Sequence, residues 1–157
     1  MILRLITWYL IILILGWMSF PLSYRLLAKL PDRGYALSRI LGLLLWGFIF
    51  WLLTNLGLLQ NKPGGILLAL LTVATLSLWG AWRRWGDLWD WVKANQRLIL
   101  TTELVFLAGF AFMALVRASD PDATGTEKPM ELAFINAILH SPTFPPRDPW
   151  LSGYAIS

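Results

Sequence analysis

The chain contains no cysteine among its 157 residues, and charged side chains make up only 14% of it. The first absence excludes disulfide bonds and metal sites built on thiolates. The second argues against a soluble domain, because about one quarter of the residues in such a domain carry charge. A single histidine further limits metal ligation. The sequence is therefore poor in the side chains on which most soluble enzymes and metal centres depend.

Apolar side chains take the place of the missing charged ones, at 57% of the sequence and with ten tryptophans. Four runs with at most one charge reach the roughly 17–25 residues that a helix needs to cross a bilayer. They are residues 5–22, 40–59, 64–82 and 98–116. The first run lacks a small-residue cleavage site, so we interpret it as a retained span. Because lipid offers the backbone no hydrogen-bond partners, all four must be helices. The sequence predicts an all-α polytopic membrane protein in contact with the lipid bilayer.

Basic side chains predict the orientation of these spans. The loops at residues 23–39 and 83–97 each contain four Lys or Arg and fewer acidic residues. Both loops lie on one side, which the positive-inside rule assigns to the cytoplasm of a cell (plasma or inner) membrane. The N-terminus and the segment after the membrane region (residues 118–157) are then extracytoplasmic. This sorting of charge by side explains the basic composition without a nucleic-acid partner.

Two features of the predicted membrane region (residues 1–117) stand apart. Trp82, Trp85 and Trp89 recur at spacings of three and four, which predicts a short helix in the cytoplasmic interface with its indoles toward lipid. Glu103 is the only ionisable residue well inside a span. An intramembrane carboxylate is a candidate functional group, and the favoured alternative is pairing with a basic residue on a neighbouring helix.

The extracytoplasmic segment contains an expected helix from about residue 127 to 139, with Thr126 as its cap. Glu127 and Glu131 lie four positions apart, on one face near the positive end of the helix dipole. The stretch "SPTFPPRDPW" that follows is too rich in proline for a helix or strand and is expected to run extended. His140 lacks a second ligand, so the residues identify no cofactor and give a divalent metal no support.

The closing stretch "GTEKPMELAFINAILHSPTFPPRDPWLSGYAI" resembles the signature of the YYY membrane proteins (Chlor-Arch YYY domain). These are large polytopic proteins related to GT-C type integral-membrane glycosyltransferases. The similarity extends back to "FPLSYRLLAKLPDRGYALSRILGLLLWGFIFWLLTNLG", at residues 20–57. The tyrosine triplet of that family is absent and the chain stops about where it is expected. The resemblance therefore implies either an N-terminal fragment or a truncated gene, and on both interpretations the isolated chain is expected to be inactive.

The resemblance also implies a function, namely transfer of a sugar from a polyprenyl phosphate to a glycan or lipid acceptor on the extracytoplasmic face. Glu127 is then the candidate general base and Glu131 a weaker one. Thr126 stands where relatives carry the Asp of an acidic pair, which disfavours metal binding there. The expected contacts with the lipid phosphate and the sugar are Lys128, Arg117, Arg147, Asp148, Trp150 and Tyr154.

Two other functions are compatible with the residues. The chain is alternatively a non-catalytic membrane scaffold or lipid-binding module that uses the proline-rich stretch as a docking strap. A transporter is a weaker alternative, because few polar side chains are present in the spans to line a path.

Overall fold

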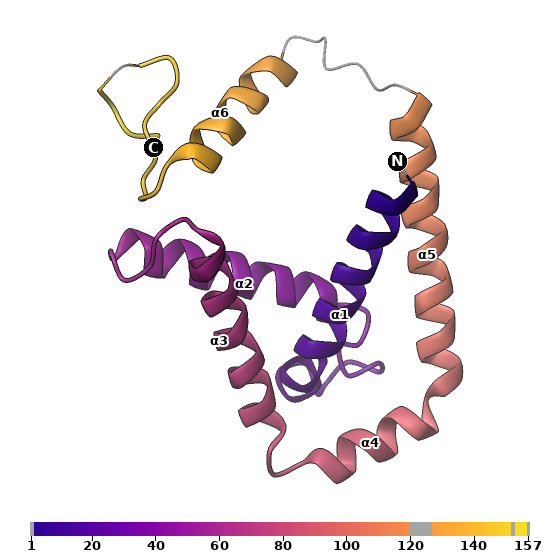
Figure 1. Cartoon of the computed structure of the whole chain (residues 1–157). Coiled ribbons are helices and arrows are strands. Elements are labelled where there is room, and N and C mark those ends of the chain that lie inside the picture. The colour runs from indigo at the N-terminus through magenta and orange to yellow at the C-terminus, as the bar shows by residue number, and fades with distance from the viewer. Residues whose placement is uncertain (1, 120–126, 152, 157) are drawn as a thin grey trace. The chain divides into compact units, whose positions relative to one another are not determined.

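The computed structural model describes residues 2–119, 127–151 and 153–156, which form six helices (Figure 1). Four of them are long and apolar enough to cross a membrane. They lie within a few residues of the predicted runs, so the all-α polytopic fold is confirmed. The helices are α1 (Ile2–Leu26), α2 (Ser38–Asn55), α3 (Pro63–Ala81), α4 (Trp85–Ala94), α5 (Gln96–Ser119) and α6 (Lys128–His140), of which α1, α2, α3 and α5 are the four candidate spans.

The chain forms two compact units, whose boundaries pass through α2 and α3. The first unit comprises residues 1–45 and 72–120, and the second comprises residues 46–71 and 121–157. The predicted division at residue 117 separates a membrane region from an extracytoplasmic segment. It concerns position relative to the bilayer rather than contacts within the chain, and it stays a prediction.

Helix α1 continues past Pro21 to Leu26, four residues beyond the predicted end of the first span at residue 22. A proline inside a helix removes one backbone donor and usually kinks or ends the helix. Here the surrounding side chains are buried, including Phe20 and Tyr24, so tertiary packing stabilises the last turn. The Ser23 hydroxyl also donates a hydrogen bond to the Phe20 carbonyl at 3.0 Å.

Aromatic rings form the core of the first unit. The ring of Phe20 lies 5.1 Å from that of Tyr35 and 5.5 Å from that of Trp91, measured between centroids. The Phe20–Tyr35 pair meets edge to face at 83°, a geometry that the ring quadrupoles favour. Leu88 of α4 joins the same cluster and is 4% exposed. The end of α1, the connection to α2, and α4 therefore share one core.

Helix α4 confirms the short tryptophan-rich helix predicted in the loop at residues 83–97. Trp82 lies in the turn before α4 rather than within it, because the chain leaves α3 at Ala81 and turns. Trp85 and Trp89 are 45% and 55% exposed, away from the buried Leu88. Their side chains are thus exposed, and their contact with interfacial lipid stays a prediction.

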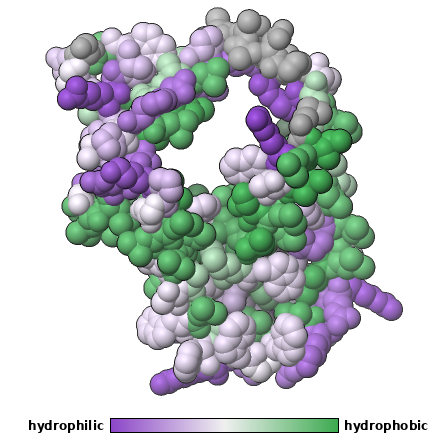
Figure 2. All heavy atoms as spheres, viewed as in Figure 1, coloured by the Kyte–Doolittle hydropathy of each residue, from purple (hydrophilic) through white to green (hydrophobic). Residues whose placement is uncertain are grey.

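Apolar side chains also face outward along the spans (Figure 2). Helix α5 has no buried residue, and Val105, Phe112 and Leu115 are 67%, 65% and 70% exposed. Water disfavours so many exposed apolar side chains along one helix, whereas hydrocarbon does not. These faces fit a bilayer as their surroundings.

The second unit is organised around the C-terminal end of α6. The side-chain amide of Asn61, in the short connection between α2 and α3, donates hydrogen bonds to the carbonyls of Ile138 and Ser141 at 2.6 and 2.8 Å. Its backbone N–H donates to the Pro142 carbonyl at 2.9 Å. Because the last carbonyls of a helix have no intrahelical partner, Asn61 caps α6 from a distant part of the chain.

Candidate functional site

The predicted acidic residues lie at the start of α6. Glu127 is the N-cap residue, and its carbonyl accepts the backbone N–H of Glu131 at 3.0 Å. The Glu127 side chain makes no capping hydrogen bond, and both carboxylates are exposed. Lys128 is the first residue of the helix. Thr126, the predicted cap, lies outside the described residues.

The closing loop turns back on itself instead of running extended along its length. Arg147 and Ala155 form an antiparallel bridge, and the Asp148 N–H donates to the Tyr154 carbonyl at 2.9 Å. The Oδ1 atom of Asp148 accepts the backbone N–H groups of Trp150 and Leu151 at 2.8 and 2.9 Å. Aspartate commonly stabilises a turn in this way. Asp148 therefore shapes the loop, and the bridge reverses the chain despite its prolines.

Trp150 attaches this loop to α6. Its indole meets the ring of Phe134 at a centroid distance of 5.3 Å and an angle of 66°. Trp150 still leaves 57% of its surface exposed, and Tyr154 is 70% exposed. Both aromatic groups can contact a ligand or lipid without rearrangement.

A cavity of about 450 Å³ lies between the C-terminal end of α6 and the closing loop. The sequence predicted Arg147 as a phosphate contact, and Arg147 lines this cavity. The sequence predicted neither the cavity nor the position of His140 beside it. The remaining lining residues are Ala137, Ser141, Pro142, Thr143 and Pro145. The cavity is therefore a pocket with one permanent cation, one imidazole and two hydroxyl groups.

The orientation of His140 follows from its hydrogen bond. Its Nδ1 atom lies 2.8 Å from the carbonyl oxygen of Asn136. A carbonyl oxygen only accepts, so Nδ1 carries the hydrogen in this contact and Nε2 keeps the lone pair of the neutral ring. When the ring is neutral, Nε2 is therefore the acceptor nitrogen that a general base requires.

The structure separates the predicted site residues into groups. Glu127 and the cavity lie at opposite ends of α6, whose 13 residues span about 20 Å at 1.5 Å per residue. Arg117 lies in the last turn of α5, in the first unit. Glu127 is consequently close to Lys128 and Glu131 but not to Arg147.

Glu103 has the basic partner that the sequence led us to expect. Its Oε1 atom forms an ion pair with Arg39 of α2 and accepts a hydrogen bond from the Tyr35 hydroxyl. The Arg39 side chain is 6% exposed and that of Glu103 is 18% exposed. The Arg39 guanidinium also lies 4.3 Å from the ring centroid of Phe106. A half-buried carboxylate is thereby neutralised within the first unit.

Tyr35 is the member of this cluster that sequence reasoning missed. It precedes α2, where the Asp32 carboxylate holds the turn by accepting the N–H groups of Gly34 and Ala36 at 3.0 and 2.9 Å. Burial raises the pKa of the Tyr35 hydroxyl, and its hydrogen bond to Glu103 raises that pKa further. The hydroxyl therefore remains a donor over the physiological pH range.

Within residues 2–119, 127–151 and 153–156, no cluster of three or more His, Asp or Glu side chains is placed to hold a metal ion. The polar groups that could bind a ligand are cationic and hydroxylic. They suit an anion better than a metal.

Four apolar spans and sparse polar clusters define a polytopic all-α membrane protein. Residues 45–157 match the family described as uncharacterised membrane proteins, DUF2298, and the chain belongs to this family. Neither a curated protein nor a solved structure is similar to the chain. The family description places the protein in a membrane and assigns it no activity.

Proposed function

We propose that this chain is the N-terminal part of a membrane glycosyltransferase that uses a polyprenyl-phosphate sugar on the extracytoplasmic face. The observation that carries the proposal is the cavity beside Arg147 in the second unit. The resemblance of the closing stretch to YYY proteins and GT-C type enzymes supports it, and membership of a membrane-protein family agrees with a lipid-linked substrate.

The donor phosphate is proposed to bind in this cavity. A guanidinium group presents a planar pair of N–H donors that matches two phosphate oxygens, so Arg147 is the principal contact. The Thr143 hydroxyl lies on the same wall and is a further donor. The phosphate is also the leaving group, and a fixed cation beside it stabilises the negative charge that develops during transfer.

The transfer forms one bond to the anomeric carbon, breaks another and moves one proton. The acceptor oxygen forms a bond to the anomeric carbon, while the bond from that carbon to the phosphate oxygen breaks and leaves its electron pair on the phosphate. The acceptor proton passes to a general base. Such a base contributes about 10²–10⁴-fold to the rate when it lies within hydrogen-bond reach.

Two residues compete for the role of base. The resemblance favours Glu127, which requires the donor phosphate near Lys128 at the first turn of α6. The cavity favours His140, which lines it together with Arg147. Glu127 and His140 lie at opposite ends of α6, about 20 Å apart, so one reacting centre cannot use both residues as its base.

A binding experiment distinguishes the two placements of the phosphate. Wild-type chain, Arg147→Gln and Lys128→Gln are compared in nanodiscs for binding of a polyprenyl phosphate. Placement in the cavity predicts about a tenfold loss of affinity in Arg147→Gln alone, as expected for one charge-assisted contact. A loss confined to Lys128→Gln would move the phosphate to the start of α6 and restore Glu127 as the base. Absence of binding by the wild type contradicts the proposed function.

The base is identified in a full-length family member with sugar-transfer activity. Substitutions at the positions equivalent to Glu127→Gln and His140→Gln are compared for the rate at saturating donor. The true base should lower that rate by about 10²-fold or more, whereas the other substitution should leave it nearly unchanged. Full activity in both variants would exclude both residues from the role.

The scaffold alternative has one observation in its favour. Ile135 and Leu139 leave 50% and 67% of their surfaces exposed on α6, which gives a partner an apolar face to cover. On this alternative, Glu127→Gln and Arg147→Gln have no effect. Deleting "FPPRDPW" should instead abolish association with other membrane proteins, measured by cross-linking in intact membranes.

A further inference from the structure

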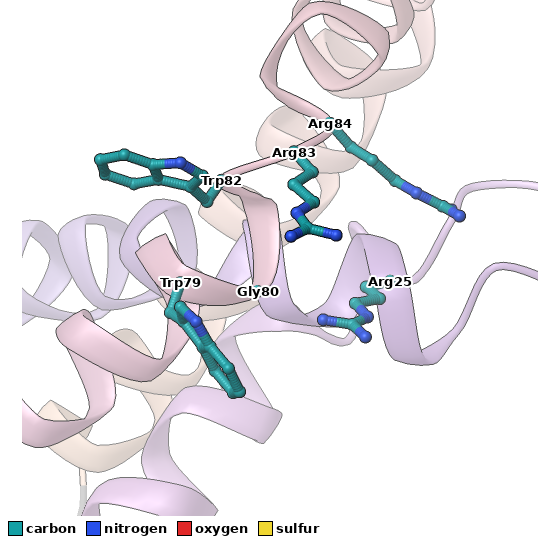
Figure 3. Close-up of a pocket in the computed structure, with 6 residues that line it drawn as sticks. All are labelled: Arg25, Trp79, Gly80, Trp82, Arg83 and Arg84. Carbon is teal, nitrogen blue, oxygen red and sulfur yellow. The ribbon is translucent and has the colours of Figure 1, made fainter.

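Three arginines line a second cavity, in the first unit at the ends of α1 and α3. Arg25 lies in the last turn of α1, while Arg83 and Arg84 follow the end of α3 at Ala81. The cavity has a volume of about 450 Å³. Its other lining residues are Trp79, Gly80 and Trp82 (Figure 3).

The wall of this cavity carries positive charge without a counter-ion. No carboxylate lines it, and within the described residues none of its three arginines forms an ion pair. Figure 3 shows the side chains of Arg25 and Arg83 directed into the same space from two different helix ends. Like charges that approach in this way repel each other, and an anion between them removes the repulsion.

Two general effects explain why basic residues lie at this end of the first unit. They do not explain why three of these residues line one cavity. A cation at a helix C-terminus interacts favourably with the helix dipole, which applies to Arg25. The positive-inside rule accounts for the charge of the loops as a whole. Neither effect requires that side chains from α1 and from the α3–α4 turn line one cavity.

Tryptophan side chains place the cavity at the level of lipid headgroups. Trp79 and Trp82 are 73% and 75% exposed beside the arginines. Exposed indoles at the end of an apolar span concentrate where hydrocarbon meets the polar headgroups. The anion nearest to the cavity in a membrane is therefore the phosphate of a lipid.

We propose that Arg25, Arg83 and Arg84 bind the phosphate headgroup of an anionic membrane lipid. The indoles of Trp79 and Trp82 lie against its glycerol and upper acyl chain. The site is independent of the proposed glycosyltransferase function. It lies on the predicted cytoplasmic side, whereas the donor phosphate is proposed to bind in the extracytoplasmic segment.

The test uses the whole chain purified in a mild detergent. Binding of phosphatidylglycerol is measured by native mass spectrometry, and thermal midpoints are compared with phosphatidylglycerol, phosphatidylcholine and inorganic phosphate. The cavity variant is Arg25→Gln/Arg83→Gln/Arg84→Gln. Its matched control, Lys29→Gln/Lys93→Gln/Arg97→Gln, removes the same number of positive charges from the same two loops outside the cavity.

The wild type should bind phosphatidylglycerol and gain thermal stability from it, with little gain from phosphatidylcholine or inorganic phosphate. The cavity variant should bind phosphatidylglycerol at least about tenfold more weakly, and the control should stay within about twofold of the wild type. Equal losses in both variants would show diffuse attraction between charges and overturn the site. An equal thermal gain from inorganic phosphate would overturn its assignment to a lipid.

A charge-conserving variant keeps the test valid if the triple glutamine substitution impairs folding. Arg25→Lys/Arg83→Lys/Arg84→Lys retains every positive charge but loses the paired donors of guanidinium. Its affinity for phosphatidylglycerol should fall several-fold, between those of the wild type and the glutamine variant. Unchanged affinity would contradict the guanidinium–phosphate contacts.

Discussion

Arg39, in the first turn of α2, forms an ion pair with Glu103 of α5, which is 64 positions further along the chain. The Tyr35 hydroxyl donates a second hydrogen bond to the same carboxylate oxygen. A lone carboxylate in a membrane span is costly, and the pair makes the cluster electrically neutral. Among the described residues, the Oε2 atom of Glu103 and the Nε atom of Arg39 have no hydrogen-bond partner, so both hydrogen bonds of the cluster to Glu103 end on Oε1.

Removal of one member of this pair should destabilise the protein strongly. Arg39→Met leaves Glu103 buried without a counter-charge, and the free energy of unfolding should fall by about 3–5 kcal/mol. The double variant Arg39→Met/Glu103→Met should recover most of that loss, because no buried charge remains. Unfolding in mixed micelles with increasing SDS measures both values. If the double variant lost as much stability as the two single substitutions together, the direct pairing of Arg39 with Glu103 would be contradicted.

Tyr35→Phe should change how stability depends on alkaline pH. Because the folded-state pKa of Tyr35 is raised, its contribution is fully present below the unfolded pKa of about 10 and is lost as the pH rises above that value. The wild type should therefore lose stability above about pH 10 more steeply than the variant. Unfolding midpoints in mixed micelles from neutral pH upward test this expectation.

A spectroscopic titration provides the control for Tyr35. Because its pKa is raised, Tyr35 should not ionise at moderately alkaline pH in the folded protein. The rise of tyrosinate absorbance at moderately alkaline pH should consequently be equal in the wild type and in Tyr35→Phe. A smaller rise in the variant would mean that Tyr35 ionises normally.

Gly42→Ala should weaken the contact between α1 and α2. A Cβ atom at Gly42 would lie 2.3 Å from the Ser19 hydroxyl oxygen and 3.0 Å from Leu15 Cγ. Small residues let helices approach closely, and overpacking such a contact costs about 1–3 kcal/mol. Gly47→Ala is the matched control, since a Cβ there meets nothing within 4 Å and alanine favours the same helix. The two variants are compared by SDS unfolding, and equal stabilities would contradict the close approach.

Asn61→Ala should loosen the last turn of α6. The variant loses the two side-chain hydrogen bonds to Ile138 and Ser141, each of which contributes about 1 kcal/mol. Amide hydrogen exchange in residues 137–141 should accelerate by about tenfold or more. Asn55→Ala is the control, because its side-chain amide donates only to the Trp51 carbonyl of its own helix. Acceleration in both variants to the same degree would contradict the capping role.

The four spans could be predicted from the sequence because the bilayer permits few alternatives. A long apolar run in hydrocarbon must satisfy its backbone internally, so composition and length suffice to predict a helix. The boundaries were less accurate where packing overrides a local signal. Pro21 favours the end of a helix, but the buried side chains around it keep α1 helical to Leu26.

The candidate sites were predictable only as single residues. The cost of a charge in hydrocarbon indicates from sequence alone that Glu103 needs a partner, but several basic residues were available. Arg147 was a candidate contact for phosphate, whereas the cavity that it shares with His140 depends on how the closing loop returns to α6. The loop turns because Asp148 accepts two of its backbone amides.

The sequence by itself determined that this is an all-α membrane protein, because hydropathy and helix length act locally along the chain. Only the tertiary structure decided which side chains come together: Tyr35 and Arg39 with Glu103, Asn61 with the end of α6, and Arg25, Arg83 and Arg84 along one cavity. These groups come from elements that are distant in sequence. Their proximity depends on the packing of helices, which no local pattern of residues specifies.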